Sequence, residues 1–463
     1  MKTIFPVAGL LIGLVSINLQ AADVYGEFPV TVKNYTGSKT DSTSYSGQIA
    51  RHLLHNSLKK LASKGNGKAN PELKAQMMAY YEGKAPGRAI IDPETRGEFV
   101  VKQTQIDEIS KKKNLKGKTY KGTVAGWPGN MTGAEIIEMM IDKASSAEQG
   151  FDPLTGYNYP QLISKFLMGA VFYNQAVDNY LDERLEAGNK PNNKPYKDGA
   201  HYTGKEHVWD EAFGYFGAPA HALVIDAKQV HGIAKKKNLS IADYNKDGKV
   251  NLYGEMTYAH AYYAADADKS GSNYLHTITQ AFVDGRKLIS SANGEALTDA
   301  QRAKLEAYAD VIETNWEKVI AEATFKYAGS VYKDLQKLKI IVETNGDAKS
   351  AFADYGKHWG EMKGFAMALE TGSKNLGEVG ARLNRLIGYG PILLGGNQVT
   401  GLDANGNFVT GGARTMGDYM VHMIKVQKLL GDHFGLKARK NDVTAHMAEL
   451  VESLGESLSA END

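Results

Sequence analysis

The sequence predicts an all-α protein: two packed helical bundles, with an EF-hand-type calcium loop inserted between them and a few short strands. Apolar residues recur at the i, i+3, i+4 and i+7 spacing of a helix face, most clearly from Leu305 to Tyr327. Thr298 and Gln301 form a capping-box pair just before this stretch. Alternating, strand-like patterns are rare, so helices should supply most of the core.

Apolar periodicity and capping-box pairs also predict the positions of the other helices. Thr132 with Glu135 predicts the start of a helix that continues to about Ile141. Residues 162–173 are apolar nearly all round, which predicts a helix buried at the centre of a bundle. Further amphipathic helices are expected at about 46–62, 281–291, 352–370 and 414–430, a short strand at 28–32 and a small hairpin at 405–409.

The first residues have the form of a secretory signal. Lys2 precedes an apolar run over residues 4–19, which ends before Ala21 and Ala22. The run is shorter than the roughly 20 residues that span a bilayer, so we expect export and cleavage rather than a membrane-spanning helix. The expected compartment is the periplasm, or the protein is secreted.

Downstream of residues 1–21, a polar entry segment covers 22–45 and one all-α domain covers 46–463. Within that domain we expect two similar halves, about 46–235 and 275–463, separated by the calcium-loop insertion at about 240–275.

Composition excludes several classes of function. The chain has no cysteine, which rules out thiol catalysis, disulfides, thiolate metal sites and the lipid-bearing cysteine of a lipoprotein. Its 54 basic and 53 acidic residues nearly balance, which argues against a nucleic-acid partner. His-Glu-x-x-His, Gly-x-Ser-x-Gly and Gly-Lys-Ser/Thr motifs are missing, so we name no catalytic residues.

The sharpest local motif is a calcium-type loop that begins at Asp243. Oxygen-bearing side chains occupy positions 1, 3, 5 and 9, glycine position 6 and an aliphatic residue position 8. Position 12 is Gly254, so either Glu255 closes a loop that is one residue longer or a water molecule does. The expected calcium ligands are Asp243, Asn245, Asp247, Lys249 (through its main-chain carbonyl), Asn251 and Glu255. An ordinary Asp/Asn/Gly turn is the alternative.

Three other segments could bind metal. Asp266-Ala-Asp268-Lys-Ser270 begins like a second calcium loop but lacks a closing acid. His207 with Asp210, and His358 with Glu361, each place an acid three residues after a histidine, on one helix face. Transition-metal sites in bundles are built from such pairs, with Glu211, Glu313 and Glu317 as further candidate ligands. A buried histidine held by a single hydrogen bond is the alternative for either pair.

Four segments carry a resemblance to a known family: Tyr45–Arg51, Leu167–Gln175, His207–Phe216 and His358–Phe365. In these the chain resembles the domain of unknown function 4856 family, a relative of the imelysin-like proteins of bacterial envelopes. The resemblance implies a two-bundle helical fold, an envelope location and genes linked to iron acquisition. Gly356, His358 and Glu361 match the Gly-x-His-x-x-Glu signature of imelysin-like proteins, although in those relatives the signature lies in the first half of the chain.

The leading hypothesis is a non-catalytic periplasmic metal-binding protein, an accessory to the acquisition of iron or another metal, with calcium as a structural ion. Its partners would be metal ions and a metal-uptake component of the envelope. One alternative is a peptidase or hydrolase of the imelysin type. Another is a surface recognition protein that calcium makes rigid.

The signal segment leads to a direct test. Cleavage after Ala21 or Ala22 should leave a mature chain that starts at Ala22 or Asp23. Intact-mass spectrometry of the envelope fraction measures this, and full-length protein recovered in the membrane would contradict it.

Overall fold

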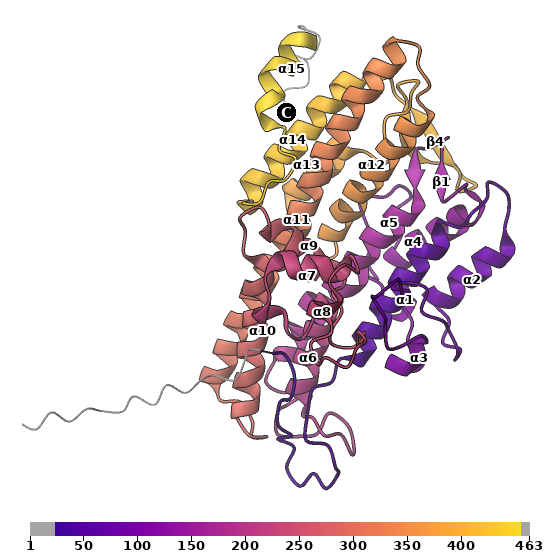
Figure 1. Ribbon diagram of the computed structural model, residues 1–463. Helices are drawn as coiled ribbons and strands as arrows, with labels where there is room; N and C mark the ends of the chain where they lie inside the picture. The colour runs from indigo at the N-terminus through magenta and orange to yellow at the C-terminus, as the bar shows by residue number, and fades with distance from the viewer. Residues whose placement is uncertain (1–23, 455–463) are drawn as a thin grey trace, which may run out of the picture.

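The computed structural model describes residues 24–454, and helices dominate them (Figure 1). In chain order the α-helices are α1 (Ser46–Ala62), α2 (Pro71–Tyr81), α3 (Ile106–Ile109), α4 (Gly133–Ser146), α5 (Tyr159–Leu167), α6 (Gly204–Phe216), α7 (Ala227–Ala234), α8 (Leu239–Ala242), α9 (Ala259–Asp268), α10 (Tyr274–Ser291), α11 (Asp299–Glu343), α12 (Lys349–Leu369), α13 (Gly377–Ile387), α14 (Met416–Phe434) and α15 (Met447–Leu454). The prediction of a mostly helical protein is confirmed. The expected signal segment lies outside the described residues.

Six short 3-10 or π-helical segments and two small sheets are the other regular elements of the described chain. The short segments are η1 (Lys116–Lys118), η2 (Met168–Tyr173), η3 (Gln175–Tyr180), η4 (Glu183–Leu185), η5 (Ala222–Val224) and η6 (Thr444–His446), with η2 and η3 in the wider π-helical geometry. Antiparallel pairs join β1 (Phe151–Asp152) to β2 (Tyr157–Asn158) and β3 (Gln398–Leu402) to β4 (Phe408–Gly411). The second pair is the predicted hairpin. The predicted strand at 28–32 is reduced to one bridge, between Pro29 and Asp41.

Helix α11 is the longest element and runs along the molecule beside α10, α12 and α14 (Figure 1). Its predicted capping box forms: the Thr298 side chain accepts the backbone N–H of Gln301, and the Gln301 side chain accepts the N–H of Thr298. The helix continues past the predicted end at Tyr327 because Val331, Leu335 and Leu338 extend the same buried stripe. No helix among residues 24–454 combines the length and apolarity needed to cross a membrane.

Glycines allow α12 to approach α5 closely. Gly356, Gly360 and Gly364 are four residues apart and therefore share one face of α12. A Cβ atom on Gly364 would lie 2.6 Å from Cβ of Lys165 on α5, closer than real Cβ contacts allow. This close packing leaves Lys165 opposite Glu361, one turn before Gly364, with 3.5 Å between the ammonium nitrogen and the carboxylate.

Replacing Gly364 by alanine should destabilise the fold. The added methyl group gains up to about 1 kcal/mol of helix propensity, but overpacking against α5 costs about 1–3 kcal/mol. We expect a lower urea midpoint for Gly364→Ala. Gly360→Ala is the matched control, because it gains the same propensity while its nearest contact, the Asn158 carbonyl oxygen, is 3.3 Å away. A Gly364→Ala protein as stable as the wild type would contradict the packing argument.

Candidate functional site

Residues 243–255 form a loop between α8 and α9 that is held together by its own polar groups. The Asp243 carboxylate accepts the backbone N–H groups of Asp247 (3.0 Å) and Gly248 (2.8 Å). The Asn245 side-chain oxygen accepts the Asp247 N–H at 2.9 Å. Gly248 has φ of +86°, a left-handed conformation that side chains disfavour, which explains the glycine at this position. The chain therefore turns sharply where a calcium loop must turn.

Glu255 folds back across this loop. Its carboxylate accepts the N–H groups of Asn245 (3.1 Å) and Asn251 (2.7 Å), and the residue is only 6% exposed. Burial raises the pKa of Glu255, and the nearby charges of Asp243 and Asp247 raise it further. Both carboxylate oxygens of Glu255 therefore contact the backbone of the loop.

Two further expected calcium ligands, Asn251 and Asp247, contact the segment at residues 102–103. The Asn251 side-chain oxygen accepts Gln103 Nε2 at 2.8 Å, and Lys102 Nζ lies 2.9 Å from the Asp247 carboxylate. Lys249 donates its backbone N–H to Asp247 at 3.0 Å. A parallel bridge joins Val250, at position 8, to Val101.

The second calcium-like stretch has a different structure. Helix α9 includes both Asp266 and Asp268, so these two acids lie on a helix end and not in a loop. Asp266 contacts three lysines, Lys269, Lys326 and Lys440, at 2.8–2.9 Å. Asp268 accepts the first N–H groups of α10. Because the two carboxylates serve separate partners, the structure does not bring them together as an ion site.

In the first histidine segment, the structure brings His207 to Glu211 and not to Asp210. His207 Nε2 lies 3.7 Å from the Glu211 carboxylate, and the imidazole packs on the rings of Tyr196 and Tyr202. Burial lowers the pKa of His207, which favours the neutral form that binds metals. His207 Nδ1 and Glu211 Oε2 are buried and have no hydrogen-bond partner within residues 24–454.

In the second segment, His358 and Glu361 also have different partners. His358 Nδ1 lies 2.6 Å from Asp334, and this hydrogen bond raises the pKa of His358. Glu361 faces Lys165 instead. Of the further candidate ligands, Glu313 pairs with Ser373 and Lys374. Over the described part of the chain, no three His, Asp or Glu side chains are grouped as metal ligands would be.

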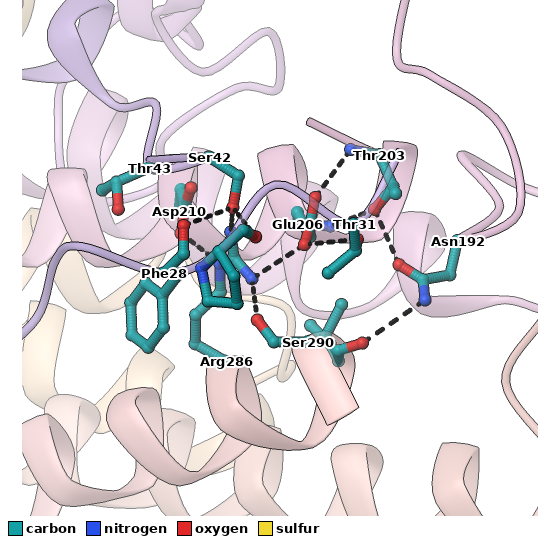
Figure 2. Close-up of polar contacts among 12 residues, drawn as sticks. Phe28, Thr31, Ser42, Thr43, Asn192, Thr203, Glu206, Asp210, Arg286 and Ser290 are labelled. Carbon is teal, nitrogen blue, oxygen red and sulfur yellow. Dashed lines mark hydrogen bonds and ion pairs between the residues drawn. The ribbon is translucent and has the colours of Figure 1, made fainter. Parts of the chain in front are cut away.

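Asp210 belongs to a buried ion-pair network around Arg286 (Figure 2). Arg286, on α10, is fully buried; its Nε lies 2.9 Å from Asp210 and its Nη1 3.2 Å from Glu206, both on α6. Its Nη2 donates to Ser42 Oγ at 2.6 Å, and its guanidinium carbon lies 4.7 Å from the Phe28 ring centroid. A planar guanidinium can serve several acceptors at once in this way.

The network also fixes the entry segment. Tyr25 donates its hydroxyl to Asp210 at 2.7 Å, Ser44 its backbone N–H at 2.9 Å, and Thr31 its hydroxyl to Glu206 at 2.9 Å. Each contact links residues more than 160 positions apart. The first described residues are thereby held against α6 and α10.

Arg286→Met should strongly destabilise the protein, because it leaves two buried carboxylates without their cation. Removal of one partner of a buried ion pair costs about 3–5 kcal/mol. Thermal unfolding measures the loss, and trypsin should cut within residues 24–45 sooner than in the wild type. Adding Glu206→Gln and Asp210→Asn to Arg286→Met should recover part of the stability. A single variant that melts like the wild type would contradict the role of the network.

The comparisons with known proteins establish the family. No curated protein and no solved structure matches the chain. The model of one family, domain of unknown function (DUF4856), matches residues 140–386, more than half of the chain. The matched region contains the calcium-type loop, both histidine segments and Arg286. The chain therefore belongs to the DUF4856 family.

Proposed function

We propose that this protein is a non-catalytic metal-binding protein of the bacterial envelope, with calcium as a structural ion in the loop at residues 243–255. The acquisition of iron or another metal is the process that it would assist. The fold of the loop is the observation that carries the calcium proposal.

Two features of the loop favour calcium. Asp243, Asn245 and Glu255 each accept a backbone N–H group of the loop, so their oxygen-bearing side chains lie against the loop backbone. The negative charges of Asp243 and Asp247 raise the pKa of Glu255, and Lys102 Nζ lies 2.9 Å from the Asp247 carboxylate. A divalent cation with oxygen preference would relieve this repulsion. An ordinary turn has no need of a buried glutamate.

Calcium should stabilise the protein moderately. Because the closing glutamate is displaced by one position, we expect an affinity in the range of extracellular modules, with Kd of about 10⁻⁴ to 10⁻³ M. At about 10 mM calcium, this affinity gives roughly 1.4–2.7 kcal/mol. Thermal unfolding with calcium, magnesium or chelator measures the effect. A melting temperature that does not respond to calcium, in the wild type as in Asp247→Ala, would refute the site.

Two variants change the affinity in opposite directions. Glu255→Gln removes the buried carboxylate and should weaken calcium binding, whereas Lys102→Met removes the cation that faces Asp247 and should strengthen it. Since the pKa of Glu255 is raised, its proton competes with calcium, and the wild-type affinity should fall as the pH is lowered. Isothermal titration calorimetry at several pH values measures both effects. Equal affinities in the wild type and Lys102→Met would contradict the electrostatic argument.

For a transition metal, His207 and Glu211 are the pair that the structure supports best. His207 Nε2 lies 3.7 Å from Glu211 Oε2, and this carboxylate oxygen is buried without a hydrogen-bond partner in the described chain. Two ligands do not complete a coordination shell, so water or a metal-bound ligand would have to supply the rest. Elemental analysis of protein purified without a histidine tag should detect iron, copper or zinc that His207→Ala loses. Calcium alone would favour the surface recognition alternative.

A further inference from the structure

A cleft of about 980 Å³ lies where α1 and α5 meet α9, α11 and α12; we call it the central cleft. Eight lysine and arginine side chains line it, against two carboxylates, Asp92 and Glu361. Two more carboxylates, Glu94 and Asp266, pair with lining cations from beside the cleft. Even with these counted, cations outnumber carboxylates two to one. The chain as a whole is nearly neutral, so this excess is local.

Two of the amines lie together in the lining. Lys165 is only 3% exposed, and Lys59 lies close enough for its charge to lower the pKa of Lys165. Burial lowers the pKa of Lys165 and the adjacent Lys59 lowers it further, while Glu361 opposes both effects. Glu361 is the carboxylate that acts most strongly on each of the two lysines. A second negative group beside them would therefore be stabilised.

Two uncharged side chains that line the central cleft have polar atoms without hydrogen-bond partners in the described chain. Gln161 Oε1 and Ser164 Oγ, both on α5, are buried, line the central cleft and have no hydrogen-bond partner in the described chain. Buried side-chain polar atoms are nearly always satisfied in folded proteins. The Ser164 hydroxyl can donate to an anion beside Lys165.

We propose that the central cleft binds a small polyanion, either a polycarboxylate or a phosphorylated compound, with Lys59, Lys165 and Ser164 contacting its negative groups. Lysine ammonium groups bind carboxylates and phosphates as compact point charges. The volume is in the range of small-molecule sites, which holds the ligand to a few hundred daltons. Four tyrosines in the lining, Tyr258, Tyr262, Tyr263 and Tyr327, supply ring surface for its carbon skeleton.

The argument for this site does not rest on the calcium loop, since none of residues 243–255 lines the central cleft. It also differs from metal binding at His358 and Glu361. Both residues line the cleft, but the surrounding lysines repel a bare cation and attract an anion. A metal could enter this cleft only as part of a negatively charged complex.

Isothermal titration calorimetry of the full mature chain with citrate and with pyrophosphate tests the proposal, in about 100 mM NaCl to screen weak surface binding. We expect at least one of the two to bind at a single site with Kd below about 1 mM. Binding of citrate alone assigns a polycarboxylate, and binding of pyrophosphate alone a phosphorylated compound. Triethyl citrate has the same skeleton without charge and should not bind. No binding of either anion, or equal binding of the ester, overturns the proposal.

Lys59→Met/Lys165→Met should weaken binding at least about tenfold, because two charge-assisted contacts are lost. Lys304→Met/Lys337→Met removes the same charge from the exposed surface of α11, outside the cleft, and should change the affinity less than about twofold. If the buried substitution prevents folding, Lys235→Met/Lys357→Met replaces exposed cleft lysines and should still weaken binding severalfold. Equal affinities in cleft and control variants would refute the site.

Discussion

The close approach of α12 to α5 is the constraint on which the centre of the molecule depends. Glycines on one face of α12 leave no side chain between the two helices, so Lys165 and Glu361 meet across the contact. Both groups are then buried, and each needs the other's charge. Lys165 lines the central cleft at this contact, and α1 adds Lys59 and Lys60 and α11 adds Lys326 to the same lining. The glycines of α12 thus allow a buried pair of opposite charges, Lys165 and Glu361, between α5 and α12.

Local features could be predicted from the sequence to within a few residues. The capping boxes at Thr132 and Thr298 mark true helix starts, α1 has its predicted bounds, and the hairpin near 405 forms. Hydrophobic periodicity was wrong at helix ends, since α11 extends beyond Tyr327 and α10 begins at Tyr274, before the predicted start at 281. In both cases residues beyond the expected end keep buried contacts, which no local signal marks as a stop. Hydrophobic periodicity also missed α2 and α13.

The partners of the polar residues could not be predicted in this way. His207 and Asp210 share a helix face by spacing, but Asp210 contacts Arg286, 76 positions away, and Tyr25, 185 positions away. Spacing along a helix shows which side chains are neighbours, and tertiary packing decides which group faces them. The near-equality of positive and negative residues likewise conceals the central cleft, because composition carries no information on where charges lie.

The bridge between Val101 and Val250 has a consequence for conformational entropy. The segment that carries Val101 also carries Asp92 and Arg96, which line the central cleft, and it is closed by a second bridge between Ala89 and Gln105. An ion that restricts the loop at 243–255 would therefore reduce the freedom of this wall as well. Less entropy would then be lost when a ligand binds in the cleft and orders this wall. By thermodynamic reciprocity, a ligand bound in the cleft would strengthen the binding of the ion at the loop. Two sites without a common residue can share free energy through one short stretch of backbone.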